Sequence, residues 1–238
     1  MTEQQRQEIL ARAKVFFRES IATNHKRNTE KLVDISNFNV NPFLDIYLAK
    51  FAFGSDTPEN IAKALIYPRV LGSSITTTFG TQLQYFCSNV LPGFASTTSG
   101  IDIEFVDALD GCRKYCQMKS GPNTINKDDV VTIKGHFTAI RNLARANRLE
   151  NFNPDRDCLV GVFYGEPSEL SVHYRKINQS HPVFIGKDFW HRLTGDENFY
   201  NELISAIAEV AVEIDGRETL ERVIQELAAQ IRQSRNQK

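Results

Sequence analysis

Between residues 100 and 120 the chain carries two acids, a glutamine and a lysine at short spacings. Asp102 and Glu104 are two residues apart, and so are Gln117 and Lys119. Residues at that spacing on a β-strand project from the same side of the strand. Carboxylate and amide oxygens are hard ligands that suit Mg²⁺, and a neighbouring lysine can orient or activate a water molecule. This set of side chains is typical of metal-dependent phosphodiester hydrolysis.

The pattern around these four residues predicts a β-hairpin. Residues 101–106 alternate between apolar and polar, and residues 112–120 are strand-like. Between the two runs stand Asp110 and Gly111, a strong signal for a tight two-residue turn. We therefore expect two antiparallel strands joined at this dipeptide, with Asp110 in the turn and away from the other polar residues.

This hairpin fixes a register in which Asp102 faces Lys119 and Glu104 faces Gln117. All four side chains then share one face of the sheet. The opposite face is apolar, with Ile103 opposite Met118 and Phe105 opposite Cys116. Acid and lysine pairs across a ladder are also common as solvated ion pairs, so the hairpin taken by itself leaves a structural role open.

A row of basic residues follows the hairpin. Residues 126–149 are predicted to form a helix, in which Lys134, Arg141, Arg145 and Arg148 are spaced by seven, four and three residues. On a helix they share one face, and no acidic residue falls between positions 130 and 149. Such a row suits the phosphate backbone of DNA, although a solvated helix face is the alternative.

Two further segments are candidates for contact with DNA. In the polar loop 121–126, the side chains of Asn123, Thr124 and Asn126 can form hydrogen bonds to DNA, or Asn126 can simply cap the helix that follows. Residues 172–177 are predicted to form a strand. On it, Arg175 and Lys176 are candidates for reading guanine in a major groove, with an ordinary surface strand as the alternative.

The remaining chain is predicted to surround a short sheet with helices. Buried strands are expected at 159–164 and 183–185. Helices are expected at 3–17, 43–51, 58–66, 76–89, 197–214 and 218–232. This order predicts an α/β fold with a mixed sheet flanked by helices, in a single domain.

Composition narrows the functional class only slightly. The net charge is −1, which neither indicates nor excludes nucleic-acid binding, because a basic face matters more than a basic total. No apolar run is long enough to span a membrane, and residues 1–18 lack the order of a signal peptide. We expect a cytoplasmic protein without membrane contact.

At the hairpin the sequence resembles the PD-(D/E)XK nucleases. Residues 98–105 and 117–126 are more closely similar to the type II restriction endonucleases of the EcoO type, the RGGNCCY-cutting family. The resemblance covers most of the chain. It implies a restriction-endonuclease-like domain over 1–238, with a helical part at 1–95, a catalytic sheet core at 96–195 and C-terminal helices at 196–238.

The resemblance also implies roles for the hairpin residues. Asp102 matches the first motif aspartate, a direct metal ligand, and Lys119 matches the motif lysine. Gln117 stands where the family usually has Glu or Asp, so one negative charge is lost. Glu104 could restore that charge. The expected metal ligands are Asp102, Gln117 and Glu104, and the expected cofactor is Mg²⁺.

These observations predict a type II site-specific deoxyribonuclease that hydrolyses double-stranded DNA at a short palindrome. A homodimer is expected because two-fold symmetry matches such a site, and a cognate DNA methyltransferase is expected as genetic partner. One alternative is a nuclease of the same fold that acts in repair or transposition with little sequence preference. The other is a DNA-binding module that has lost catalysis, with Gln117 as the mark of that loss.

Overall fold

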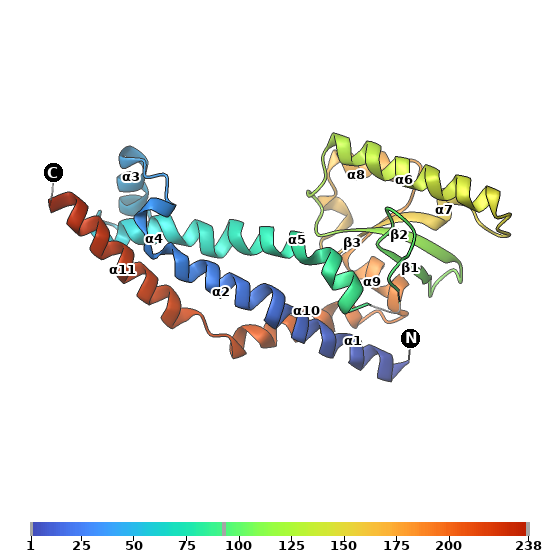
Figure 1. Cartoon of the computed structure of the whole chain (residues 1–238), viewed down its shortest axis with the longest axis horizontal. Helices are drawn as coiled ribbons and strands as arrows, with labels where there is room; N and C mark the ends of the chain where they lie inside the picture. The colour runs from blue at the N-terminus through green and yellow to red at the C-terminus, as the bar shows by residue number, and fades with distance from the viewer. Residues whose placement is uncertain (1, 92–93, 237–238) are drawn as a thin grey trace. The chain divides into compact units, whose positions relative to one another are not determined.

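The computed structural model describes residues 2–91 and 94–236 (Figure 1). Its contacts divide the chain into two compact units. Unit 1 comprises Met1–Phe16 and Gly80–Ala208, and unit 2 comprises Phe17–Phe79 and Glu209–Lys238. The predicted hairpin lies in unit 1. The description of residues 1–238 as a single domain stays a prediction.

Unit 1 is built around a mixed sheet with the strand order β1-β2-β3-β4. The strands are β1 (Ile103–Val106), β2 (Arg113–Lys119), β3 (Cys158–Val162) and β4 (Val183–Ile185). β1 pairs antiparallel with β2, while β2, β3 and β4 are parallel. Ala95 forms a further antiparallel bridge to Ile103 at the outer side of β1. The predicted mixed sheet, including the strands near 159 and 183, is confirmed.

One face of the sheet is covered by α6 (Lys127–Ala146) and α8 (Val172–Asn178). Asn126 starts α6 through a capping box with Asp129, because each side chain accepts a hydrogen bond from the other's backbone N–H. Burial of apolar side chains at helical spacing then holds α6 on the strands. The buried cluster includes Ile133, Phe137, Ile140, Val160 and Val162.

The predicted strand at 172–177 is wrong, because this segment is the helix α8. Its alternating look came from Val172 and Tyr174, two residues with high β propensity. In α8 the buried side chains are Tyr174 and Ile177, which are three residues apart and so lie on one helical face. Packing of that face on the sheet overrides the local preference.

The opposite face of the sheet packs against α9 (Gly186–Thr194). A Cβ atom on Gly161 would collide with the ring of Phe189, so this position in β3 accepts only glycine. Trp190 is fully buried and donates its indole N–H to the carbonyl of Phe163 at 2.9 Å. Phe86 packs edge-on against Phe163 and extends this aromatic cluster.

The other helices of unit 1 are α1 (Glu3–Phe16) and the single turn α7 (Pro154–Asp157). Two helices extend across the division between the units, α5 (Ser74–Asn89) and α10 (Phe199–Glu213). Beyond Phe16 the chain stays helical through a π-helical turn into α2 (Thr23–Glu30). The predicted end of the first helix near residue 17 is therefore too early.

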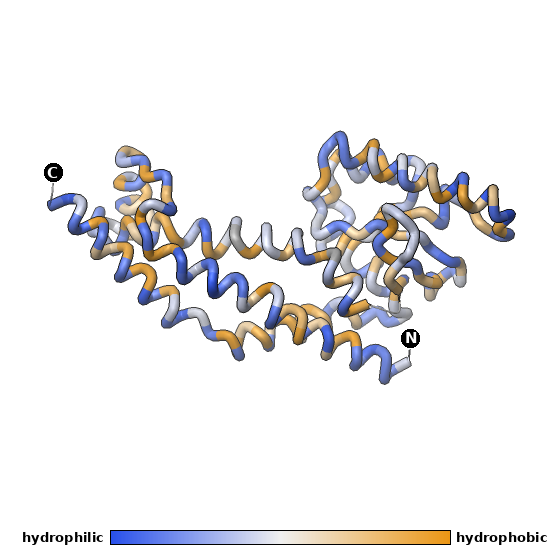
Figure 2. Tube along the Cα trace, in the orientation of Figure 1, coloured by the Kyte–Doolittle hydropathy of each residue, from blue (hydrophilic) through white to orange (hydrophobic). Residues whose placement is uncertain are grey.

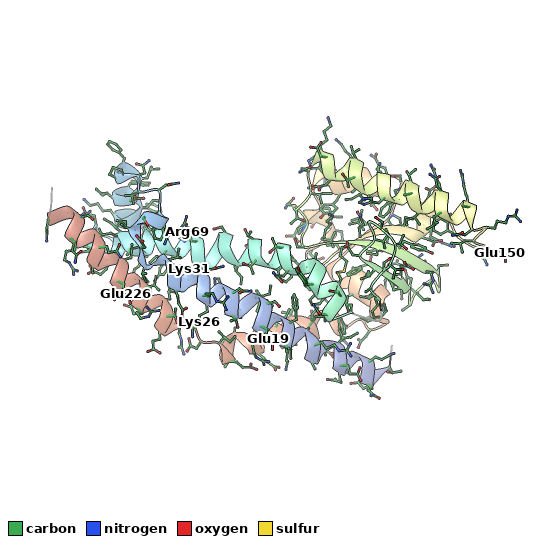
Figure 3. All side chains as sticks on the ribbon, in the orientation of Figure 1. Glu19, Lys26, Lys31, Arg69, Glu150 and Glu226 are labelled. Carbon is green, nitrogen blue, oxygen red and sulfur yellow. The ribbon has the colours of Figure 1, made fainter. Side chains whose placement is uncertain are left out.

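Unit 2 contains α2, α3 (Pro42–Phe53), α4 (Pro58–Pro68) and α11 (Arg217–Asn236). Its core is formed mainly by α4 and α11, with Ile66 and Leu227 fully buried. Orange and blue alternate along α11 in Figure 2, as expected for an amphipathic helix. Glu226, labelled in Figure 3, belongs to its exposed side. Within the described residues no helix has the length and apolar character of a membrane span.

Candidate active site

The β1–β2 hairpin has a wider loop than the sequence predicts. Ile103 pairs with Cys116 and Val106 with Arg113, so the ladder is shifted by two residues from the predicted register. The last hydrogen bond between the two strands before the loop runs from the N–H of Asp107 to the carbonyl of Cys112, at 3.0 Å. Asp102 therefore does not face Lys119, and it falls opposite Gln117 instead.

A shift of two residues keeps every side chain on its predicted face, because strand side chains alternate with a period of two. Asp102, Glu104, Gln117 and Lys119 thus still share one face. The pairs on that face differ from the prediction, since Glu104 lies opposite Tyr115 rather than Gln117.

We expected the other face to be purely apolar, but it also carries a buried charge. Phe105 pairs with Lys114, whose side chain is only 1% exposed. Its ammonium forms ion pairs with Asp110 at 2.6 Å and with Asp157 at 3.2 Å. Asp110 therefore lies in the loop and away from the polar cluster, and it stabilises a buried lysine.

Asp102 is the carboxylate of the shared face. Its Oδ2 accepts a hydrogen bond from the backbone N–H of Met118 at 2.7 Å, which fixes the carboxylate against β2. Burial raises the pKa of Asp102 above its ordinary value, although the Met118 N–H and the charges of Lys119 and His136 act in the opposite direction. The site therefore holds a desolvated carboxylate that gains from a nearby cation.

The Gln117 amide is held by two partners. Its Nε2 donates a hydrogen bond to the carbonyl of Gly100 and lies 2.5 Å from Nδ1 of His136 on α6. Its Oε1 is buried and has no hydrogen-bond partner among the residues that the structure describes. A buried carbonyl oxygen without a partner is costly, and a ligand at that oxygen would remove the cost.

Gly100 and His136 pack closely behind this amide. Gly100 has φ +77°, and a Cβ atom there would lie 2.5 Å from Cγ of the His136 ring. Only glycine combines that backbone conformation with so close an approach. His136 could not be predicted as part of the site from the sequence, because a histidine beside the buried stripe of a helix has no chemical signal until the helix is docked on the hairpin.

Lys119 ends β2 with a partly exposed side chain. Within the described residues its ammonium has no hydrogen bond or ion pair, and its charge acts on Asp102. An ammonium in this state is free to contact a water molecule or a phosphate oxygen.

Glu104 is occupied by other partners. Its carboxylate accepts hydrogen bonds from Ser96 Oγ at 2.7 Å and Thr98 Oγ1 at 3.0 Å, and it pairs with Arg113 at 3.3 Å. In the part of the chain that the structure describes, no group of three or more His, Cys, Asp or Glu side chains is arranged to hold a metal ion. The oxygens available at the hairpin are thus one carboxylate and one amide.

The predicted basic row is only partly on a helix face. Lys134 is half-buried, and Arg141 and Arg145 are exposed on α6, while Arg148 follows the end of the helix with φ 51°. Lys134 and His136 are two residues apart, which separates them by roughly 200° around the helix axis. The row therefore lies on the side of α6 away from the Gln117 amide.

The loop candidates have different surroundings. Asn126 uses its side chain to cap α6. Thr124 donates its hydroxyl to the carbonyl of Gly121 at 2.9 Å, and Asn123 is exposed. These contacts give Asn126 the structural role that the sequence left open.

Arg175 and Lys176 are exposed on the helix α8 rather than on a strand. The guanidinium of Arg175 is near the carbonyl of Ser168, at 3.5 Å. Both cations are therefore presented to solvent by a helix.

A mixed four-stranded sheet with helices on both faces and polar side chains on its antiparallel hairpin defines a restriction-endonuclease-like α/β fold, as predicted. The family described as type II restriction endonuclease EcoO109I matches residues 12–215 of the 238 residues, and the chain belongs to this family. No curated protein matches the chain. Family membership makes the chain a DNA-cutting hydrolase by class.

Proposed function

We propose that the chain is a Mg²⁺-dependent endonuclease that cuts both strands of a short DNA palindrome, with Asp102, Gln117 and Lys119 as its active centre. The observation that carries the proposal is the Gln117 amide, whose nitrogen is engaged and whose buried oxygen has no partner. Asp102 on the same face supplies a desolvated carboxylate. Together they form a small oxygen-donor site beside a free lysine.

The donor set fits Mg²⁺. This ion is commonly bound by one or two carboxylates, several waters and substrate phosphates rather than by a full protein cage. Asp102 and the Oε1 of Gln117 would hold it, and DNA would complete the coordination. When bound, the cation would stabilise the negative charge that develops on the scissile phosphate. Glu104 is not a ligand in this proposal, because Ser96, Thr98 and Arg113 already occupy its carboxylate.

The chain's own residues orient the reaction. The Lys119 ammonium would hold the attacking water and a phosphate oxygen in line with the bond to be broken. The water oxygen bonds to phosphorus as the bond to the 3′ oxygen breaks, leaving a 5′-phosphate by analogy with the family. His136 acts through Gln117 as a positioning residue, since its ring keeps the amide nitrogen turned away from the cation.

Contacts with DNA and assembly complete the proposal. The exposed cations Arg141, Arg145, Arg175 and Lys176 are candidates for phosphate contacts, and Asn123 for a contact near the scissile strand. Lys134, Thr124 and Asn126 remain candidates, although each also has a structural environment of its own. A homodimer would match a palindromic site, and a cognate methyltransferase would protect the host DNA.

Digestion of unmethylated phage DNA in Mg²⁺, with a chelator control, tests this function. Discrete fragments that disappear with the chelator support site-specific cutting, and the mapped ends would give the site. A smear would favour a nuclease with little sequence preference. DNA binding without cutting in Mg²⁺ or Mn²⁺ would favour the inactive module, and absence of both would refute the proposal.

A further inference from the structure

Helix α3 of unit 2 exposes an unusual number of large apolar side chains. The exposed fractions are Phe43 86%, Phe51 78%, Tyr47 58%, Leu44 55%, Leu48 42% and Ile46 36%. A helix of a globular protein normally turns its apolar residues toward the core. Among the described residues, α3 buries only Asp45 and Ala49, which are four residues apart on one side of the helix, and Ala49 belongs to the core shared with α4.

The exposed area is large enough for a protein interface. With roughly 200 Å² for a fully exposed aromatic side chain and somewhat less for Leu or Ile, the six residues expose on the order of 650 Å². The largest apolar patch of a typical monomer covers about 300–600 Å². A standard interface buries about 800 Å² per partner, so this face supplies most of one half.

Four of the exposed apolar residues of the helix are placed symmetrically about Tyr47, while Leu44 is matched by Lys50. Phe43 and Phe51 lie four residues before and after it, and Ile46 and Leu48 lie one residue before and after it. If two copies of α3 cross antiparallel at Tyr47, Phe43 of each copy meets Phe51 of the other. An isologous two-fold contact requires this kind of self-complementary surface.

The charge of the face also favours a second copy. Lys50 is the one exposed charged residue among the described side chains of α3, and it pairs with Asp56 at 3.6 Å near the end of the helix. Two such faces approach without like-charge repulsion. A helix that binds a membrane surface instead carries several lysines or arginines along its polar face.

We propose that the α3 face, residues 43–51, is the self-association surface of the chain, and that its occupant is α3 of a second copy, crossed antiparallel at Tyr47. The inference names a surface for the homodimer of the proposed function. It does not require that the chain cuts DNA, because association by α3 needs neither DNA nor a metal.

Sedimentation velocity without DNA or metal tests the proposal, using Phe43→Glu and Phe51→Lys. The wild type is expected to be a dimer at micromolar concentration. Each variant alone is expected to dissociate at least about a hundredfold more readily, because two glutamates or two lysines face apolar rings in its dimer. In an equimolar mixture, one Glu–Lys pair and one Phe–Phe pair form, so the dimer is expected to return.

The control is Val131→Glu on α6, where a valine that is 68% exposed is replaced outside unit 2, and it is expected to stay dimeric. Circular dichroism verifies that each variant is folded. A monomeric wild type would overturn the proposal. This result is also the one expected if another part of the same chain covers α3. Variants that stay dimeric, or a mixture that stays monomeric, would also overturn it. Cleavage assays are separate, so loss of cutting with an intact dimer would count against the proposed function only.

Discussion

Changing the glutamine at position 117 to glutamate gives the most specific test of the oxygen-donor site. The change replaces the Nε2 that donates to Gly100 and lies 2.5 Å from Nδ1 of His136. In the metal-free protein the new oxygen would face the Gly100 carbonyl. A buried group left without its partner costs about 1–3 kcal/mol. At roughly 2–4 °C per kcal/mol for a chain of this size, we expect the Tm to fall by several degrees.

With a divalent cation present, the effect of Gln117→Glu is reversed, because the new negative charge attracts the cation. Two unit charges at 4 Å attract by about 4 kcal/mol at an effective dielectric constant of 20. For a divalent cation the same expression gives about 8 kcal/mol. This attraction exceeds the cost of the lost amide contacts by more than the roughly 1.4 kcal/mol that corresponds to tenfold tighter binding. Gln117→Glu is therefore expected to bind Mn²⁺ at least about tenfold more tightly than the wild type. Gln117→Met, which has no ligand oxygen, is expected to bind more weakly.

The assay is calorimetric titration of Mn²⁺ into the DNA-free protein at fixed pH, with thermal unfolding of the same samples. For Gln117→Glu we expect a less stable metal-free protein and tighter cation binding. If this variant binds no more tightly and Gln117→Met binds as well as the wild type, then Gln117 is not a ligand and the site has been misassigned.

Three other substitutions, with Gly111→Ala as a control, test the packing of the hairpin. Because the pKa of Asp102 is raised by burial, its contribution to folding is most favourable below the ordinary value of 3.8 and is lost as pH rises through the raised pKa. Asp102→Asn is thus expected to raise the Tm of the metal-free protein at pH 7 and to abolish cleavage, and calorimetry showing an unchanged or lower Tm would contradict this. Gly100→Ala is expected to destabilise the protein by more than about 1 kcal/mol and to weaken Mn²⁺ binding. The control Gly111→Ala, where φ is +70° but a Cβ atom would have nothing within 4 Å, is expected to change stability only. Equal effects of the two variants on Mn²⁺ binding would refute a role for the close approach of Gly100 to His136. Asp157→Asn removes one of the two carboxylates that pair with the buried ammonium of Lys114. It is expected to lower the free energy of unfolding, measured in urea, by about 3 kcal/mol. A loss well under about 1 kcal/mol would show that this ion pair contributes little.

The sequence was sufficient to predict which side chains share a face of the hairpin, because that depends only on alternation. It was not sufficient for the register. Asp107 is fully buried and pairs with Arg192 at 3.0 Å, and the N–H of Ala108 donates to the carbonyl of Arg192 at 2.8 Å. A partner 85 residues further along the chain thus shapes the loop, and no local turn signal contains that information.

The helix α8 and the position of His136 beside Gln117 could not be predicted for the same reason as the register, because each depends on contacts distant in the sequence. In so short a segment, Val172 and Tyr174 suit one face of a strand while Tyr174 and Ile177 suit one face of a helix, and burial on the sheet decides between them. His136 could be placed on the predicted helix but not beside Gln117, since the docking of α6 on the hairpin depends on the whole core. The residues of the site that carry a motif were predictable, and the residue that positions them was not.

Single-turnover cleavage by Lys119→Ala shows whether the β1–β2 hairpin performs the chemistry. The matched control is Lys187→Ala, an exposed lysine on α9 in the same unit. We expect Lys119→Ala to cut at least about a hundredfold more slowly while still binding DNA, and the control to cut like the wild type. Cutting by Lys119→Ala at the wild-type rate would contradict the account and place the active centre elsewhere.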